Sequence, residues 1–198
     1  MKITFNSPVI LGFSFLSVLV FVLTQYLGLA INLFTLPGHF EFNNWSNYPR
    51  LFSYVLGHSN ADHIIGNLSF ILLLGPIIEE KYGSKNTLIM VLTTAIITAI
   101  FHLLFFSNGL LGVSGIVFSF IVLVSLVNFR NNEIPITFIL VAIIFIGKEL
   151  IHMFNDDSIS QFAHILGGCI GAVFGFKLKS KVKGSKNSKT TDILKGLK

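Results

Sequence analysis

Long apolar blocks recur along this chain, and they leave it few folds to adopt. No Asp, Glu, Lys or Arg occurs between Lys85 and Arg130, and 53% of the 198 residues are hydrophobic while only 12% are charged. A soluble domain carries about 25% charged residues. Apolar blocks of roughly 17–25 residues cross a bilayer as helices, because the backbone groups must be paired within the segment. The sequence therefore predicts an all-α integral membrane protein.

Six blocks approach this length, so we expect residues 1–176 to form one polytopic bundle of six transmembrane helices. The predicted spans cover residues 8–31, 62–79, 87–106, 114–129, 134–153 and 160–176. The first outer loop, residues 32–57, is rich in aromatic side chains, which favour the headgroup region of a bilayer. Residues 177–198 form a basic segment that we expect to be disordered and cytoplasmic.

Lysine and arginine are distributed unequally between the two predicted sides. With six spans, both termini share a side, which holds Lys2, Lys81, Lys85, Arg130 and the lysines of residues 177–198. The other side holds only Arg50 and Lys148. Because cytoplasmic loops carry the excess of Lys and Arg, both termini are predicted to be cytoplasmic. We expect the basic segment to contact anionic lipid and not nucleic acid.

Ser114 is a conspicuous polar residue in the apolar region, within Gly112-Val113-Ser114-Gly115. The span that it begins is only about 24 Å long if helical, against a hydrocarbon core of about 30 Å. Its outer end should therefore lie below the membrane surface, and the preceding loop should dip toward a hydrated hollow. Unpaired N–H groups at a helix start favour developing negative charge. A serine here fits a nucleophile, or simply a helix cap.

His164 is the candidate base for Ser114, and it lies in the sixth predicted span. Ala163, Gly167, Gly171 and Gly175 recur every four residues around it. Such small residues let two helices approach closely, so we expect span six to pack against span four and to bring His164 within reach of Ser114. The alternative is a histidine that bonds a backbone carbonyl within the bundle.

A third group of polar residues begins the second span. Spans two, four and six run in the same direction, so their first turns share one leaflet. His63 and Asn67 are four residues apart and lie on one helix face, where both could donate to a single oxygen; a purely structural network is the alternative.

His58 points elsewhere and is expected to hold a loop. No acidic partner for His164 is evident, which predicts a Ser–His dyad.

These motifs together resemble the rhomboid family of intramembrane serine proteases. The resemblance covers residues 50–175 and rests on His58-x4-His63-x3-Asn67, Gly112-x-Ser114-Gly115, Ala163-His164-x2-Gly167 with Gly171, and Glu79-x3-Gly83. It implies that Ser114 is the nucleophile and His164 the general base and acid. The oxyanion hole would comprise His63, Asn67 and the Ser114 backbone N–H. Residues implied to support them are His58, Gly112, Gly115, Phe118, Gly167 and Gly171.

The resemblance also implies the surroundings of the reaction. The substrate would be a transmembrane segment of another protein, cut near its outer end, and no metal or cofactor would take part. Similarity to the small bacterial form implies the bacterial inner membrane, with the active site opening to the outer side. Two alternatives stay open: a catalytically silent rhomboid-like protein that binds membrane clients, and a small proton-coupled transporter whose histidines relay protons.

Two positions depart from the family pattern. Many members have Trp-Arg in the first loop, whereas Pro49 precedes Arg50 here, so Trp45 is the candidate to take over the anchoring. Many bacterial members have Tyr four residues after the serine, whereas this chain has Phe118. Phe118 can still stack on His164 but lacks the hydroxyl. Neither change removes a reacting group, so we expect activity.

Overall fold

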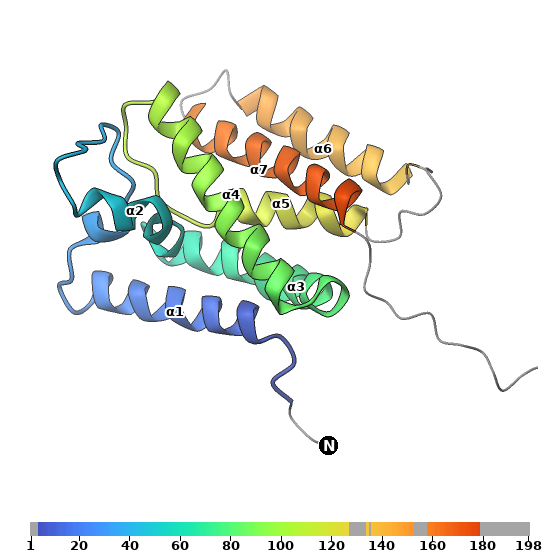
Figure 1. Cartoon of the computed structure of the whole chain (residues 1–198), viewed down its shortest axis with the longest axis horizontal. Helices are drawn as coiled ribbons and strands as arrows, with labels where there is room; N and C mark the ends of the chain where they lie inside the picture. The colour runs from blue at the N-terminus through green and yellow to red at the C-terminus, as the bar shows by residue number, and fades with distance from the viewer. Residues whose placement is uncertain (1–3, 127–133, 135, 153–157, 179–198) are drawn as a thin grey trace, which may run out of the picture.

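The computed structural model describes residues 4–126, 134, 136–152 and 158–178. These residues are helical apart from their connections and one isolated β-bridge. Figure 1 shows the elements in order: α1 Pro8–Gln25, the 3-10 helix η1 Ile31–Phe34, α2 Asn47–Ser53, the 3-10 helix η2 Tyr54–Leu56, α3 Ala61–Tyr82, α4 Ser84–Phe105, α5 Ser114–Ser125, α6 Ile136–His152 and α7 Ser158–Lys177.

Several of these helices have the length and composition of membrane spans. Within the described residues, α1, α3 and α4 are long and apolar enough to cross a bilayer, and α5 is a shorter apolar helix. With 12 residues, α5 is only about 18 Å long. The predicted fold class, an all-α membrane bundle, is confirmed.

Each predicted span overlaps one helix, but the first differs most at its end. We predicted residues 8–31, whereas α1 ends at Gln25. The apolar run continues to Ile31, but Gly28 adopts a φ of 77°, and the Leu29 N–H turns back to the Leu23 carbonyl at 3.0 Å. A left-handed glycine ends a helix readily. Residues 127–129, residue 153 and the basic segment from residue 179 onward lie outside the described residues.

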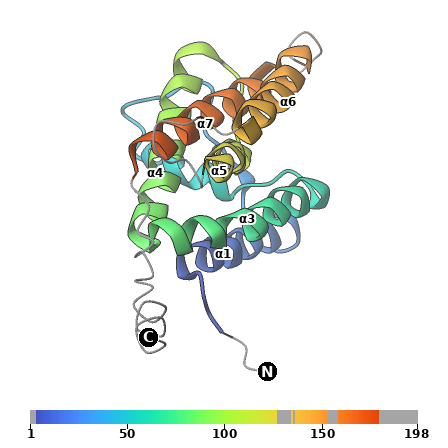
Figure 2. The ribbon, with the colours of Figure 1, turned by 90° about the vertical axis from the view of Figure 1, so that its right-hand side faces the viewer.

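α5 lies at the centre of the bundle and is covered on most sides. It contacts α3, α4, α6 and α7, and Figure 2 shows it nearly end-on with these helices around it. Figure 1 shows α3, α5 and α7 running in one direction along the bundle, while α1, α4 and α6 run the opposite way. The first turns of α3, α5 and α7 therefore face the same side of the bundle.

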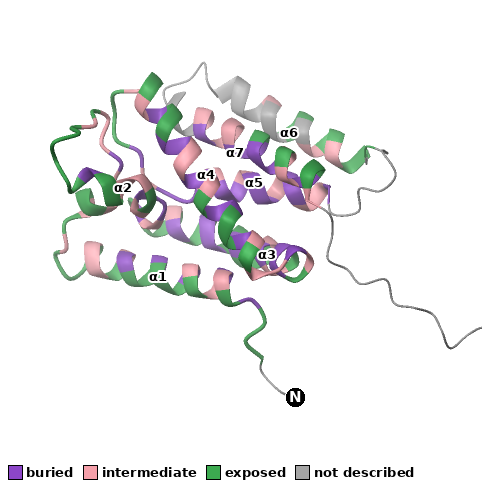
Figure 3. Cartoon of the chain, in the orientation of Figure 1, coloured by how far each residue is buried: buried purple, intermediate pink, exposed green. Residues whose placement is uncertain are grey.

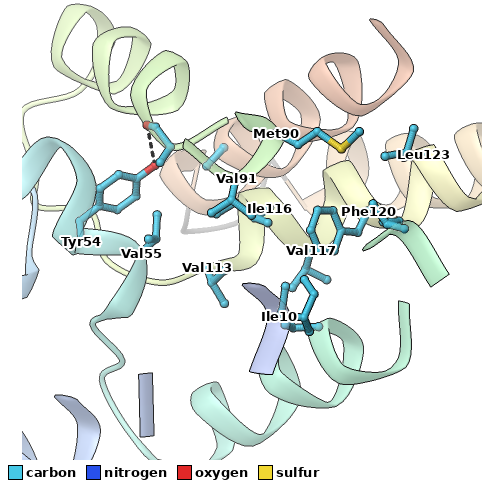
Figure 4. Packing of buried hydrophobic residues seen from close by; sticks show 14 of the residues in the cluster. Ile10, Tyr54, Val55, Met90, Val91, Val113, Ile116, Val117, Phe120 and Leu123 are labelled. Atoms are coloured by element: carbon cyan, nitrogen blue, oxygen red, sulfur yellow. Dashed lines mark hydrogen bonds between the residues drawn. The ribbon is translucent and has the colours of Figure 1, made fainter. Parts of the chain in front are cut away.

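The core follows from this arrangement. Ile116, Phe120 and Leu123 of α5 are each at most 2% exposed, and Figures 3 and 4 show the buried stripe and its packing against neighbouring helices. A helix that is apolar on most of its surface belongs in the interior of a bundle. The outward faces of α1, α3 and α4 expose large apolar side chains, among them Phe15, Leu73 and Leu104, as a lipid-facing surface does.

α7 packs on α5 through its glycines, as the predicted ladder of small residues requires. A Cβ on Gly167 would overlap the Gly115 carbonyl, and a Cβ on Gly171 would overlap the Ser119 carbonyl. The two backbones are therefore in direct contact along the helices. Only glycine permits so close an approach, so these positions set the register of α7 against α5.

Glu79 joins the C-terminal end of α3 to the N-terminal end of α1. Its buried carboxylate accepts hydrogen bonds from the Val9 N–H at 3.1 Å and the Ile10 N–H at 3.0 Å. It thus caps α1 from another helix, in the place of the usual local cap. Four residues later, Gly83 has a φ of 82° and donates its N–H to the Glu79 carbonyl at 2.8 Å. The Glu79-x3-Gly83 motif therefore makes the α3–α4 turn and fixes the start of α1.

Candidate active site

Ser114 is the first residue of α5, and the loop before it is fixed inside the bundle. Leu110 forms a two-hydrogen-bond β-bridge with Leu36, at 2.8 and 3.0 Å. Gly112 donates its N–H to the Tyr54 carbonyl at 2.9 Å, and Leu110, Gly112 and Val113 are buried. The last part of the loop is therefore enclosed by the bundle, and Ser114 itself is half-buried at its end.

The loop is also held from α4. His102 is buried, and its Nε2 lies 2.7 Å from the Asn108 carbonyl oxygen. Since a carbonyl only accepts, Nε2 carries the proton. The buried backbone of a loop must find such partners. His102 was not singled out by the sequence, although a histidine in the last turn of a span is a recognisable polar exception.

Gly112 brings α3 to the start of α5. Its φ is 113°, a region that side-chain-bearing residues rarely adopt. A Cβ there would lie 2.8 Å from both Cε1 and Nε2 of His63 and 3.9 Å from Nδ2 of Asn67. The His63 ring therefore packs on the backbone two residues before Ser114. Gly112 supports the site through both its φ and its missing side chain.

His63 and Asn67 lie on one face in the first turns of α3. Asn60 caps this helix, because its Oδ1 accepts the His63 N–H at 2.8 Å, as expected of an asparagine N-cap. Asn67 is 8% exposed, and its Nδ2 has no hydrogen-bond partner in the structure. A buried donor without a partner costs about 1–3 kcal/mol. That donor lies beside Gly112, at the edge of the site.

His164 approaches from α7. Its ring stacks on Phe118, with centroids 4.2 Å apart and planes within 6°. Phe118 follows Ser114 by four residues and therefore shares its face of α5. A Cβ on Gly115 would lie 3.3 Å from the Ala163 carbonyl oxygen, which places the residue before His164 against the residue after Ser114.

His58 is buried just before α3 and has a different environment. Its Nδ1 lies 3.1 Å from the Leu56 carbonyl oxygen, and its ring meets His63 edge-on with centroids 5.0 Å apart. Burial, together with a positive charge on His63, lowers the pKa of His58 to about 4, although the Leu56 carbonyl acts in the opposite direction. His58 is therefore neutral at pH 7 and holds the η2–α3 turn.

A cavity of about 10 Å³ lies behind Ser114, with Tyr54, Thr94, Thr98 and Gly115 among its lining residues. That volume accommodates about one water molecule. The Tyr54 hydroxyl donates to the Ala95 carbonyl at 3.0 Å, and burial raises its pKa, so Tyr54 stays protonated. The Thr94 hydroxyl is buried without a hydrogen-bond partner. Sequence reasoning missed these residues; the available signal was the i, i+4 spacing of Thr94 and Thr98 on an apolar helix.

In the part of the chain that the structure describes, no three His, Cys, Asp or Glu side chains gather as metal ligands would. Cys169 is exposed on α7, away from the glycines that contact α5. The site thus consists of a hydroxyl at a helix N-terminus, imidazoles from two other helices and an amide donor. This donor set suits nucleophilic attack by an activated hydroxyl and stabilisation of the resulting oxyanion.

Comparison with known proteins agrees with the motifs. Residues 44–181 match the family model described as Rhomboid domain, which is more than half of the chain. One similar protein is the Rhomboid protease GlpG of Haemophilus influenzae, with 27% identity over 142 residues, 70% of this chain and 72% of the relative. Residues 44–181, which match the family model, include α3, α5 and α7. This chain therefore belongs to the rhomboid family of integral membrane proteins.

Proposed function

We propose that this chain is an intramembrane serine endopeptidase that cleaves transmembrane segments of other membrane proteins near their outer end. Family membership and similarity to a rhomboid protease support a proteolytic function. One observation carries the assignment of the site. The start of α5, which presents Ser114, meets His63 and Asn67 of α3 through Gly112 and meets His164 of α7 through Phe118 and Ala163.

The proposed reaction begins at Ser114. His164 takes the proton from Ser114 Oγ as that oxygen attacks the scissile carbonyl carbon and forms a tetrahedral intermediate. The C–N bond then breaks, and His164 donates the proton to the leaving amine, which leaves an acyl-enzyme on Ser114. A water molecule attacks this ester, His164 takes its proton and returns it to Ser114, and the new carboxyl terminus departs.

The oxyanion of each intermediate requires donors. The Ser114 N–H at the start of α5 and the helix dipole favour negative charge there. Asn67 contributes a buried donor with no protein partner, and His63 contributes its Nε2, which faces Gly112. A donor aimed at a developing oxyanion contributes about 3–4 kcal/mol to catalysis in serine proteases. The free-energy cost of burying the Asn67 Nδ2 donor without a partner is thus offset when this donor bonds the oxyanion.

Phe118 gives His164 a defined orientation. The stacked ring restricts the imidazole to one plane against α5, and aromatic pairs contribute about 0.5–1.5 kcal/mol beyond burial. A dyad without an acidic third member needs another means of orienting its base. We assign that role to Phe118 and to the close packing of α7 on α5.

The proposed setting is the bacterial inner membrane, with both termini cytoplasmic. The Lys/Arg bias supports this orientation. Since α3, α5 and α7 start at the end of the bundle opposite to the basic side, the site would open outward. Water would reach it through the loop region before Ser114.

Cleavage in a defined membrane tests the proposal. The purified chain is reconstituted into liposomes with a panel of single-span proteins that carry a fluorophore on the outer segment. We expect wild type to release a fragment cut near the outer end of the span, and Ser114→Ala and His164→Ala to release none. Ser119→Ala, which removes a buried hydroxyl without a hydrogen-bond partner from the same helix, is the matched control and should cleave normally.

The result also separates the proposal from its rivals. Fragments from Ser114→Ala in the wild-type amount would contradict a serine mechanism. Stable complexes with the reporters without any cleavage by wild type would instead favour a client-binding protein. Proton uptake coupled to solute movement, independent of Ser114, would favour a transporter.

A further inference from the structure

Ser59 has no part in the proposed dyad or oxyanion hole, yet it contacts the site. It is exposed in the turn between η2 and α3, and its Oγ lies 3.2 Å from Nδ1 of His63. Ser59 and His63 are four residues apart, with Asn60 as the helix cap between them. The contact is thus built on a turn whose backbone is already fixed.

The two nitrogens of His63 face different partners. Nδ1 faces the Ser59 hydroxyl, whereas Nε2 lies 2.8 Å from the position that a Cβ would occupy on Gly112. Nε2 is therefore on the side of the ring that faces the start of α5. A neutral imidazole has one N–H, and the hydrogen bond at one nitrogen decides which of the two carries the proton. Ser59 is the group placed to bond Nδ1 of His63.

Only one tautomer of His63 suits the proposed chemistry. An oxyanion accepts hydrogen bonds, so Nε2 must carry the proton. Nδ1 then carries a lone pair, which can accept a hydrogen bond from a donor. The Ser59 hydroxyl donates or accepts as required, because its hydrogen rotates. We propose that Ser59 is a positioning residue, which donates to His63 Nδ1 and so presents Nε2–H to the oxyanion. This inference rests on the proposed function.

His58 shows the opposite case a few ångströms away. Its Nδ1 faces the Leu56 carbonyl at 3.1 Å, and a carbonyl only accepts, so His58 carries its proton on Nδ1. The two histidines touch edge-on but would have opposite tautomers, because the Leu56 carbonyl requires a proton on Nδ1 of His58, whereas the Ser59 hydroxyl can donate to an unprotonated Nδ1 of His63. Ser59 therefore does for His63 what a carbonyl could not do, since a carbonyl there would remove the donor from Nε2.

The test combines a tautomer measurement with kinetics on the full chain in detergent. Ser59→Ala removes the donor, Ser59→Thr retains it, and Ser69→Ala removes an exposed hydroxyl on α3 that donates to the Ile65 carbonyl. The 15N spectrum of histidine-labelled protein, assigned with His63→Gln, reports which nitrogen of His63 is protonated. A fluorophosphonate probe reports the rate of Ser114 labelling, and a cleaved reporter separates kcat from KM.

We expect wild type and Ser59→Thr to show His63 protonated on Nε2 at neutral pH, and Ser59→Ala to show a mixture of tautomers. A neutral hydrogen bond contributes about 0.5–1.5 kcal/mol, so kcat and the labelling rate should fall about two- to tenfold in Ser59→Ala. KM and thermal stability should stay near wild type, and Ser69→Ala should match wild type throughout.

Three results would overturn the inference: His63 protonated on Nδ1 in wild type, an unchanged tautomer and rate in Ser59→Ala, or a Thr variant as slow as the Ala variant. Failure of the proposed function looks different, since wild type would then not be labelled at Ser114. In that case the nitrogen spectrum still decides whether Ser59 sets the His63 tautomer.

Discussion

The α5–α7 interface and the ends of α3 are held together by opposite means. α7 meets α5 through glycines, with backbone against backbone and no room for a Cβ at Gly167 or Gly171. α3 is fixed by polar groups instead. Glu79, near the C-terminal end of α3, caps α1, while His58 and Asn60 hold the N-terminal end of α3.

The two regions should therefore respond to different kinds of substitution. The α5–α7 interface has no titratable group at its glycine contacts, so it should tolerate changes of pH but not an added methyl group. The ends of α3 depend on the buried polar side chains of Glu79 and His58, so they should respond to changes of charge. The proposed dyad spans α5 and α7, whereas the two proposed side-chain donors of the oxyanion hole come from α3. Base position and oxyanion stabilisation can therefore be perturbed separately.

The largest expected effect is that of Gly167→Ala. Its Cβ meets the Gly115 carbonyl, a backbone group that cannot rotate away. Overpacking costs about 1–3 kcal/mol and sometimes more, and here we expect about 3 kcal/mol or more, with loss of Ser114 labelling. Thermal unfolding in detergent measures the first and a fluorophosphonate probe the second.

Gly168→Ala is the matched control for that prediction. The added Cβ meets only Val122 Cγ2, at the ordinary contact distance of 3.4 Å. The variant also has the higher helix propensity of alanine, which stabilises a helix by about 0.5–1 kcal/mol relative to glycine. We expect unchanged or raised stability and normal labelling. Equal damage from both variants would contradict the idea that backbone contact defines this interface.

Acidification should lower folding stability through His58 at the start of α3, and not through the glycine contacts between α5 and α7. The folded-state pKa of His58 is lowered to about 4, below the usual value of about 6.5. The unfolded chain therefore binds the proton first, so the His58 contribution is fully present above pH 6.5 and is lost as the pH falls from 6.5 toward 4. The loss is up to about 3 kcal/mol.

Comparison of wild type with His58→Gln isolates this contribution from that of the other histidines. Scanning calorimetry in detergent between pH 7.5 and 4.5 should show a steeper loss of stability in wild type than in the variant. Parallel pH dependence in the two proteins would show that His58 is not held neutral by burial.

Glu79→Gln should weaken the contact between the C-terminal end of α3 and the start of α1, and leave the candidate active site unchanged. The amide keeps one acceptor oxygen but loses the charge and the second acceptor, so one of the Val9 and Ile10 N–H groups loses its partner. We expect about 2 kcal/mol of destabilisation, faster hydrogen exchange at Val9 and Ile10, and a normal labelling rate once folded. The exposed neighbour Glu80 supplies the control, Glu80→Gln, which should change none of these.

The smallest expected effect is on the orientation of His164. Phe118→Leu keeps much of the volume but removes the ring stacked at 4.2 Å. Such stacking contributes about 0.5–1.5 kcal/mol, so the labelling rate should fall up to about tenfold with little change in unfolding temperature. Phe118→Tyr keeps the ring and should label like wild type. A fall in stability equal to the fall in rate would mean that Phe118 acts through packing alone.

Much of this arrangement could be predicted because membrane helices obey strong periodic rules. Apolar length located the helices, and the four-residue spacing of Ala163, Gly167, Gly171 and Gly175 predicted the face of α7 that meets α5. The spacing of His63 and Asn67 likewise predicted a shared face. These features are local, so a single sequence contains them.

Other features depend on contacts that no local pattern contains. The end of α1 at Gln25 depends on one left-handed glycine, Gly28, within an apolar run that continues to Ile31. The cap that Glu79 supplies to α1 joins residues 69 and 70 positions apart. The Ser59 contact depends on which way one imidazole ring turns. Each feature depends on which of several chemically similar groups lies nearby in the folded chain, and the sequence alone does not distinguish between these groups.

The central claim is that Ser114 is a nucleophile activated by His164, and active-site labelling tests it most directly. The detergent-solubilised chain is treated with a fluorophosphonate and analysed by intact mass. Wild type and Ser119→Ala should each gain one adduct, mapped to Ser114, while Ser114→Ala and His164→Ala should gain none. Equal labelling of wild type and Ser114→Ala, or undiminished labelling of His164→Ala, would contradict the account.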